Sequence, residues 1–141
     1  MVIAVSACLL GKNCKYNGGN NRNEKVLEYI KGHEVIPVCP EVFGGLPTPR
    51  DPSEIVNGVV RHKDGVSVDK EFREGARIAL EKVLSSRAEL VILQSRSPSC
   101  GPDTIYDGTF SKKLIPGDGV FVQLLKEHNI KYIDVKEFCY V

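Results

Sequence analysis

The chain is expected to fold as a single-domain α/β protein, with a mostly parallel sheet, flanking helices and long loops at the carboxyl ends of the strands. Two observations predict this fold. Short apolar runs alternate with segments whose apolar residues recur at helical spacing, and this alternation is typical of βαβ units. The connections that follow the first three apolar runs are also much longer than usual for a compact domain. The length of 141 residues fits one domain.

Four apolar runs are predicted as the strands of the sheet. They are residues 2–7, 34–38, 89–94 and 132–135. Short runs rich in Val, Ile and Leu are typical of strands that are buried on both faces of a parallel sheet. Such a sheet with helices on its faces is Rossmann-like.

Three amphipathic segments are predicted as the helices. They are a segment capped near Asn23 and ending at Gly32, a segment from about Asp69 to Ser85, and a segment from Gly117 to His128. The second is the clearest, because its apolar residues fall on one stripe of a helix.

Three long polar segments follow the first three strands and are expected to be irregular. They are residues 11–23, 40–52 and 95–116. The second is too rich in Pro and Gly to predict a regular element. Asp64-Gly65, between Val59-Val60 and Val66–Val68, predicts a hairpin. Long loops on one side of a compact domain are usually functional.

The composition restricts the classes of partner. Charged residues make up 26% of the chain and the formal net charge is +1, so neither nucleic acid nor a membrane surface is an expected partner. No apolar run is long enough to span a bilayer, and the first residues lack the pattern of a signal peptide. We therefore expect a cytoplasmic protein that acts on a small molecule, with its five cysteines as reduced thiols.

Three cysteines each lie just beyond a predicted strand. Cys8 follows the first run, Cys39 follows the second and Cys100 lies shortly after the third. The carboxyl ends of parallel strands line one crevice, so these thiols are expected to converge there. Three convergent thiols can hold a metal or an iron–sulfur cluster and leave one position open for a substrate. The alternative is that they are small buried side chains of the core.

The spacing of the cysteines leaves the kind of metal open. Zinc sites usually supply cysteines in closely spaced pairs, and none of the three has a Cys-x-x-Cys partner. A 4Fe-4S cluster suits isolated cysteines from different loops better. Cys14 lies in a polar loop away from any strand end and is not expected to be a ligand. Cys139 is expected to be a packing thiol.

The segments around the cysteines resemble a known family. They are Ser6-Ala-Cys-Leu-Leu-Gly11, Cys14-Lys-Tyr-Asn-Gly18, Pro37-Val-Cys-Pro-Glu-Val42, Gly44-Gly-Leu-Pro-Thr-Pro-Arg50, Ser97-Pro-Ser-Cys-Gly101 and Ile105-Tyr-Asp-Gly-Thr-Phe110. In combination they resemble the small bacterial thiouracil desulfurases, formerly catalogued as a domain of unknown function. The resemblance covers nearly the whole chain, so residues 1–141 are expected to form one desulfurase-like domain.

This resemblance implies an iron–sulfur enzyme. Cys8, Cys39 and Cys100 would hold a 4Fe-4S cluster, and the sulfur of a thiolated pyrimidine such as 2-thiouracil would bind the iron that has no cysteine. The C–S bond would be hydrolysed without redox chemistry and sulfide would be released. Soft sulfur and a Lewis-acidic iron suit this reaction.

Four further residues are candidates for the site. Glu41, two residues after Cys39, is the expected general base, although a salt bridge with Arg50 that orders the loop is an alternative. The resemblance implies a catalytic serine near Cys100, for which Ser97 is favoured. Ser99 and Arg50 are expected to bind the substrate. The serines could equally contact the cluster or only fix the turn.

Two other functions remain open at this point. One is a zinc enzyme or zinc-stabilised domain that uses the same thiols. The other is a non-catalytic redox sensor or ligand-binding module, with iron–sulfur or zinc at the cysteines.

Overall fold

The computed structural model describes residues 1–140, and side chains as far as Phe138. The elements are β1 (Val2–Ser6), η1 (Ala7–Leu10), α1 (Glu24–Tyr29), β2 (Glu34–Val38), α2 (Pro40–Phe43), β3 (Ser53–Val56), β4 (Val59–His62), α3 (Asp69–Ser86), β5 (Leu90–Leu93), β6 (Thr104–Tyr106), β7 (Leu114–Pro116), α4 (Val120–Glu127), β8 (Tyr132–Asp134) and η2 (Val135–Tyr140), where η is a 3-10 helix. The prediction for Cys139 lies outside the described side chains.

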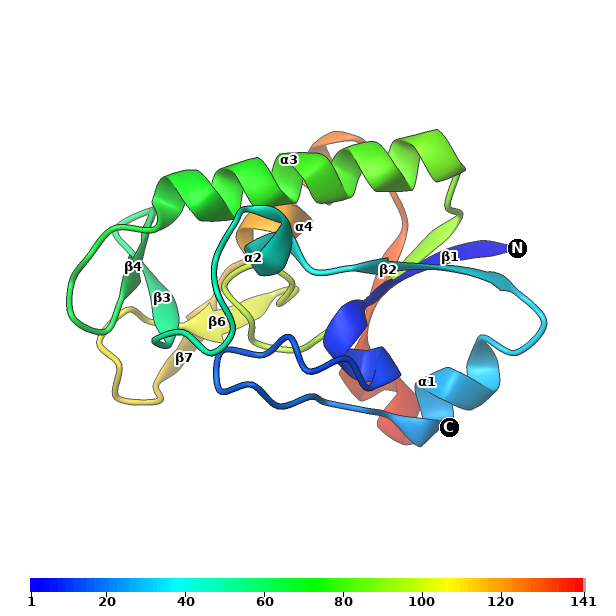
Figure 1. Cartoon of the computed structure of the whole chain (residues 1–141), viewed down its shortest axis with the longest axis horizontal. Helices are drawn as coiled ribbons and strands as arrows, with labels where there is room; N and C mark the ends of the chain where they lie inside the picture. Colours follow the sequence, from blue (N-terminus) through cyan, green and yellow to red (C-terminus); the bar gives the residue numbers. More distant parts are fainter. Residues whose placement is uncertain (141) are drawn as a thin grey trace.

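The predicted parallel sheet is confirmed. Its four strands have the order β2-β1-β5-β8, and every neighbouring pair is parallel (Figure 1). Each strand lies within one residue or so of its predicted bounds. The central strands β1 and β5 carry the most buried residues, as expected for strands that are covered on both faces.

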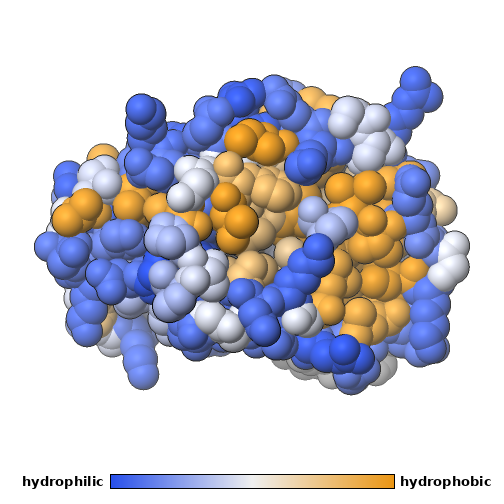
Figure 2. Space-filling model, in the orientation of Figure 1, coloured by the Kyte–Doolittle hydropathy of each residue, from blue (hydrophilic) through white to orange (hydrophobic). Residues whose placement is uncertain are grey.

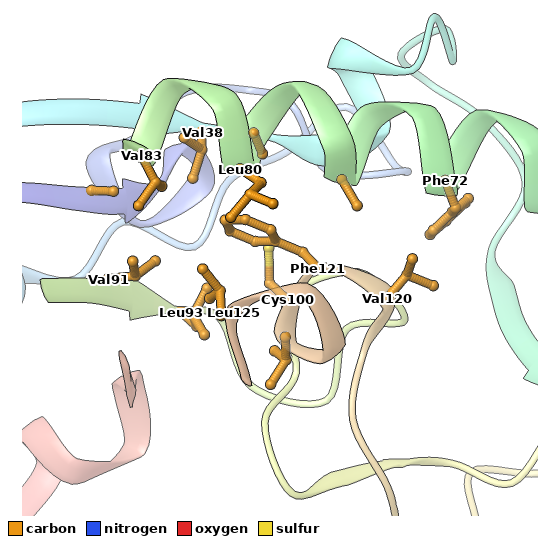
Figure 3. Packing of buried hydrophobic residues seen from close by; sticks show 14 of the residues in the cluster. Val38, Phe72, Leu80, Val83, Val91, Leu93, Cys100, Val120, Phe121 and Leu125 are labelled. Atoms are coloured by element: carbon orange, nitrogen blue, oxygen red, sulfur yellow. The ribbon is translucent and has the colours of Figure 1, made fainter. Parts of the chain in front are cut away.

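Helices cover both faces of the sheet because successive side chains of a strand point to opposite sides. Ala4 of β1 belongs to the apolar cluster under α3 and α4, which Figure 3 shows from close by. Its neighbours Ile3 and Val5 instead belong to the cluster under α1 and η2. In Figure 1, α3 and α1 accordingly lie on opposite sides of the strands.

The first helix begins where the sequence predicts. The Asn23 side chain accepts a hydrogen bond from the backbone N–H of Val26 at 3.1 Å, which satisfies one free donor of the first turn. The helix α1 ends at Tyr29, before the predicted Gly32. Gly32 has a φ of 82° and lies in the turn that leads to β2.

The front face has an uneven surface. Apolar residues gather on the half that carries β1, β2 and α1, and polar residues cover most of the half with β3 and β4 (Figure 2). Within the described residues, no helix is both long enough and apolar enough to cross a membrane.

The long segments contain more regular structure than predicted. Residues 40–43 form the short helix α2 in the segment expected to be irregular. Proline is compatible with the first turn of a helix, because the N–H that it lacks would have no partner there. Strands β6 and β7 pair antiparallel within the loop predicted for residues 95–116. The prediction of wholly irregular loops is therefore wrong at both places.

The predicted turn at Asp64-Gly65 is present, but the regular hairpin lies just before it in the chain. Strands β3 and β4 are joined by Asn57-Gly58, and both of these residues have positive φ, as a tight hairpin turn requires. Asp64-Gly65 does form a turn, with a backbone hydrogen bond from Gly65 to His62. Beyond this turn only the isolated bridge between Arg61 and Ser67 forms, so residues 66–68 are not a strand.

Two glycines bring α2 against α3. A Cβ atom on Gly75 would lie 1.6 Å from the carbonyl oxygen of Pro40, and a Cβ on Gly44 would lie 1.9 Å from the carbonyl oxygen of Glu71. The two backbones therefore touch directly. This contact sets the position of α2, and with it the position of Cys39 and Glu41.

Replacing Gly75 by alanine is expected to destabilise the protein. In an exposed helix this change is stabilising by about 1 kcal/mol, but here the added methyl group overlaps the backbone of α2. We expect a loss of about 1–3 kcal/mol or more in the free energy of unfolding, typical of overpacking. Urea unfolding measures it, with Lys70→Ala on the exposed side of α3 as the control. A Gly75→Ala variant at least as stable as the parent would contradict the close contact.

Candidate active site

A cavity of about 830 Å³ opens at the carboxyl ends of the parallel strands. Its walls include Ser6 at the end of β1, Gln94 just after β5 and Asp134 at the end of β8. Four cysteines line it: Cys8, Cys14, Cys39 and Cys100. The predicted convergence of thiols from three strand ends is therefore present in the structure.

Each of the three predicted cysteines is held by a different local structure. Cys8 lies in η1, directly after β1. Cys39 follows β2 and is the N-cap residue of α2. Cys100 is 5% exposed and packs among the core residues of Figure 3. All three backbone positions are thus fixed by regular elements or by the core.

Neighbouring groups shift the pKa values of the predicted ligands. Burial raises the pKa of the Cys8 thiol, and Cys39 adds to this rise, whereas a hydrogen bond from Asn21 Nδ2 to Cys8 Sγ (3.5 Å) opposes it. Burial likewise raises the pKa of Cys100, and the neighbouring thiols of Cys39 and Cys8 raise it further. The three sulfur atoms are therefore close enough to repel one another as thiolates.

Cys14 lies in the same cavity, although the sequence placed it away from any strand end. Its thiol neighbours that of Cys39, and the interaction of the two thiols lowers the pKa of Cys14 and raises that of Cys39. The loop of residues 11–23 folds back over the site because Arg50 holds it. Arg50 Nη2 donates to the carbonyl oxygen of Cys14 at 2.8 Å, and the Arg50 backbone N–H donates to that of Tyr16 at 2.7 Å.

The chemistry of the thiols bears on the kind of metal group that fits. Soft thiolate ligands supplied by separate segments of the chain are those that iron–sulfur clusters use. Among the described residues, no group of three His, Cys, Asp or Glu side chains is already arranged around a metal ion.

Glu41 and Arg50 form a salt bridge beside the cysteines. Arg50 Nε and Nη2 donate to Glu41 Oε1 at 3.2 and 3.0 Å. The Arg50 side chain is 4% exposed and that of Glu41 is 16% exposed. Both donors bind the same carboxylate oxygen, and this largely buried pair fixes the orientation of the carboxylate.

The remaining donors of Arg50 also bind within the protein. Nη1 donates to the Pro47 carbonyl oxygen at 3.1 Å and to the Thr48 hydroxyl at 3.0 Å, and Nη2 donates to Cys14 as described above. A guanidinium has five N–H donors, and these contacts engage them. The geometry thus favours a role in positioning Glu41 over the substrate contact expected for Arg50.

Ser97 and Ser99 lie between Glu41 and Cys100. Ser99 Oγ lies 2.9 Å from Glu41 Oε2 and 2.9 Å from Ser97 Oγ. Ser97 Oγ accepts hydrogen bonds from the backbone N–H groups of Ser99 (3.1 Å) and Cys100 (3.0 Å). Both hydroxyls are therefore in contact with the carboxylate or with the turn.

Close backbone packing holds this serine segment in place. A Cβ on Gly101 would lie 2.6 Å from the backbone nitrogen of Ser97, and a Cβ on Gly119 would lie 2.5 Å from the carbonyl carbon of Ser99. Glycine is needed at both positions to allow this approach. Gly119 is also the N-cap of α4, so that helix supports the segment.

Sequence reasoning missed two residues of the site. Asn21 donates to Cys8 Sγ, and Cys14 contacts Cys39. Both lie in a polar loop with no strand or helix pattern to place it. The Cys-x5-Cys spacing of Cys8 and Cys14 was the available signal, but it indicated no particular site.

The parallel sheet, the thiol-lined cavity at its carboxyl edge and the adjoining carboxylate–serine network define an α/β protein with a cysteine-based site for a small molecule. A family model described as 2-thiouracil desulfurase matches residues 3–137, and the chain belongs to this family.

Two relatives support this assignment. The Bacillus subtilis (strain 168) protein YbbK, described as uncharacterized, is 38% identical over 146 residues, which cover 96% of this chain and 97% of that protein. A solved structure described as the [4Fe-4S]-dependent thiouracil desulfidase TudS (DUF523) is 37% identical, with a TM-score of 0.90. That match covers 96% of this chain and 91% of the solved chain.

Proposed function

We propose that this protein is an iron–sulfur-dependent desulfurase that hydrolyses the C–S bond of a thiolated pyrimidine such as 2-thiouracil, acting as one domain over residues 1–141. The observation that carries the proposal is the cavity in which Cys8, Cys39 and Cys100 converge beside Glu41 and Ser97. Membership of the 2-thiouracil desulfurase family and the likeness to a [4Fe-4S]-dependent thiouracil desulfidase support it.

Cys8, Cys39 and Cys100 are the residues that would hold a 4Fe-4S cluster. They follow three different strands and line one cavity. When bound, a cluster with three protein ligands supplies a Lewis-acidic iron for a thiocarbonyl sulfur. Reduced thiols of this kind favour a cytoplasmic location, and we propose a small-molecule substrate.

Glu41 is the proposed general base for the attacking water. Arg50 holds one carboxylate oxygen, so the other oxygen faces Ser99 and Ser97 at the cavity wall. General bases of this kind must lie within hydrogen-bonding distance of the proton that they remove, either directly or through an intervening group. The overall reaction consumes one water and converts 2-thiouracil to uracil and sulfide.

Turnover by the cluster-loaded protein tests this function. The protein is reconstituted with iron and sulfide without oxygen and mixed with 2-thiouracil, and then uracil and released sulfide are measured. We expect equal amounts of both products. Protein that is loaded with zinc in place of iron and sulfide should show no turnover. Full activity of the zinc form would support a zinc enzyme, whereas a stable cluster without turnover would favour a redox sensor or ligand-binding module.

Arg50→Lys distinguishes positioning of Glu41 from binding of the substrate. Lysine keeps the charge but cannot reproduce the two guanidinium donors on Glu41 Oε1, so we expect kcat to fall about 10- to 100-fold through misplacement of the base, with KM little changed. Steady-state kinetics at matched iron content measure both constants. Arg22→Lys, in the exposed pair with Glu24, is the control. A raised KM with unchanged kcat would instead show that Arg50 binds the substrate.

A further inference from the structure

We propose that Ser99 is the middle member of a proton relay that connects Ser97 to Glu41. Through it, the carboxylate would remove a proton from the reacting water by way of two hydroxyl groups. This inference rests on the proposed function and gives a role in proton transfer to Ser99, which was expected to bind substrate.

The distances form one continuous chain of hydrogen bonds. Glu41 Oε2 lies 2.9 Å from Ser99 Oγ, which in turn lies 2.9 Å from Ser97 Oγ. Both separations are normal for O–H···O hydrogen bonds. The other possible acceptor for Ser99 is Cys100 Sγ at 3.7 Å, and sulfur is a weak acceptor. The carboxylate is therefore the preferred acceptor.

Hydroxyl chemistry sets the direction of the chain. An ionised carboxylate can only accept, so Ser99, which has a single O–H, donates it to Glu41. Ser99 Oγ must then accept a hydrogen bond from Ser97, and this bond uses the single O–H of Ser97. Ser97 Oγ in turn accepts from the backbone N–H groups of Ser99 (3.1 Å) and Cys100 (3.0 Å), so the reacting water would donate to Ser97 in place of the longer of these two bonds, the one from Ser99. Every donor in the chain has one acceptor, and all of them point toward Glu41.

The transfer needs no oxidant or reductant. An O–H bond of water breaks and its proton goes to Ser97 Oγ, the proton of Ser97 goes to Ser99, and the proton of Ser99 goes to Glu41 Oε2. The water oxygen forms the new C–O bond with a lone pair, and the π pair of the C=S bond moves onto sulfur. As the carbonyl forms, the C–S bond breaks and the sulfur leaves with the remaining water proton as hydrosulfide, while the proton on Glu41 is released to solvent. The Cys100 backbone N–H on Ser97 Oγ stabilises negative charge that develops there during the transfer.

Neighbouring groups hold the members of this chain of hydrogen bonds in place. Ser99 is 2% exposed, so bulk water does not compete for its hydroxyl. Arg50 fixes the far oxygen of Glu41, and Gly101 and Gly119 allow the backbone packing around both serines. A buried network of this kind holds its hydroxyl groups in fixed positions.

Ser99→Ala breaks the relay and leaves both end groups in place. We expect kcat for 2-thiouracil to fall about 10²-fold or more, with KM within about twofold and the iron content unchanged. Rates in mixtures of H₂O and D₂O should show more than one proton in flight for the parent and fewer for the variant. Ser111→Ala, an exposed serine outside the cavity, is the control. Ser99→Cys, which replaces the hydroxyl by a weak donor, is the second variant if the alanine form does not load iron.

An infrared measurement tests the relay independently of turnover. The carboxylate band of Glu41, identified by subtracting the spectrum of Glu41→Gln, should shift in Ser99→Ala and stay in place in Ser111→Ala. A parent protein without thiouracil turnover would overturn the proposed function, and the band would still show whether Ser99 donates to Glu41. An unshifted band, or a Ser99→Ala enzyme with kcat within about threefold of the parent, would overturn the relay.

Discussion

Replacing Cys8, Cys39 or Cys100 by alanine is expected to abolish both cluster binding and desulfuration. A cluster held by three cysteines loses a third of its protein ligands with each change, and structural metal groups depend on a complete ligand set. Anaerobic reconstitution followed by iron and sulfide analysis measures the effect. The parent should bind about four irons per chain, and each variant should bind far fewer and release no sulfide from 2-thiouracil.

Cys14→Ser is the matched control for these variants. Cys14 lies in the same cavity and contacts Cys39, so its loss separates the effect of a nearby thiol from that of a ligand. We expect this variant to keep the iron content of the parent. A Cys8→Ala variant that still carried four irons, or a Cys14→Ser variant that carried none, would overturn the proposed ligand set.

The second large effect is expected for Glu41→Gln. Glutamine keeps the shape of the side chain but cannot accept a proton at this site, and general base catalysis typically contributes about 10²- to 10⁴-fold to a rate. We expect kcat to fall within that range while iron content stays the same. The measurement is the steady-state rate of sulfide release from cluster-loaded protein at saturating 2-thiouracil.

An exposed carboxylate provides the comparison for this change. Glu74→Gln alters a half-exposed residue of α3 that pairs with Arg77, and it should leave kcat unchanged. Loss of iron in Glu41→Gln would point to a structural role, because the salt bridge with Arg50 also holds the loops of the site. Unaltered turnover in Glu41→Gln would remove this residue from the mechanism.

The sheet could be predicted from sequence because a short local run of apolar residues marks each strand. Val2–Ser6 and Leu90–Leu93 are short, apolar and buried on both faces, which is the signature of central parallel strands. The helix α2 could not be predicted in this way. It depends on Gly44 and Gly75, which lie 31 residues apart and meet only in the folded chain.

The candidate site likewise combines features that follow from local sequence with features that depend on residues far apart in the chain. The convergence of Cys8, Cys39 and Cys100 follows from one rule about the carboxyl ends of parallel strands. The contact of Ser99 with Glu41 joins residues 58 positions apart, and no spacing predicts it. The placement of Cys14 likewise depends on hydrogen bonds from Arg50 to a loop without regular structure.

Mössbauer spectroscopy of protein loaded with iron-57, recorded with and without 2-thiouracil, tests the three-cysteine cluster most directly. Three iron atoms with cysteine ligands and one without should give two kinds of signal in a ratio of about three to one. Added 2-thiouracil should change only the minor signal. Four equivalent irons that do not respond to 2-thiouracil, or a protein that takes up zinc and no iron, would contradict the proposed cluster and its role.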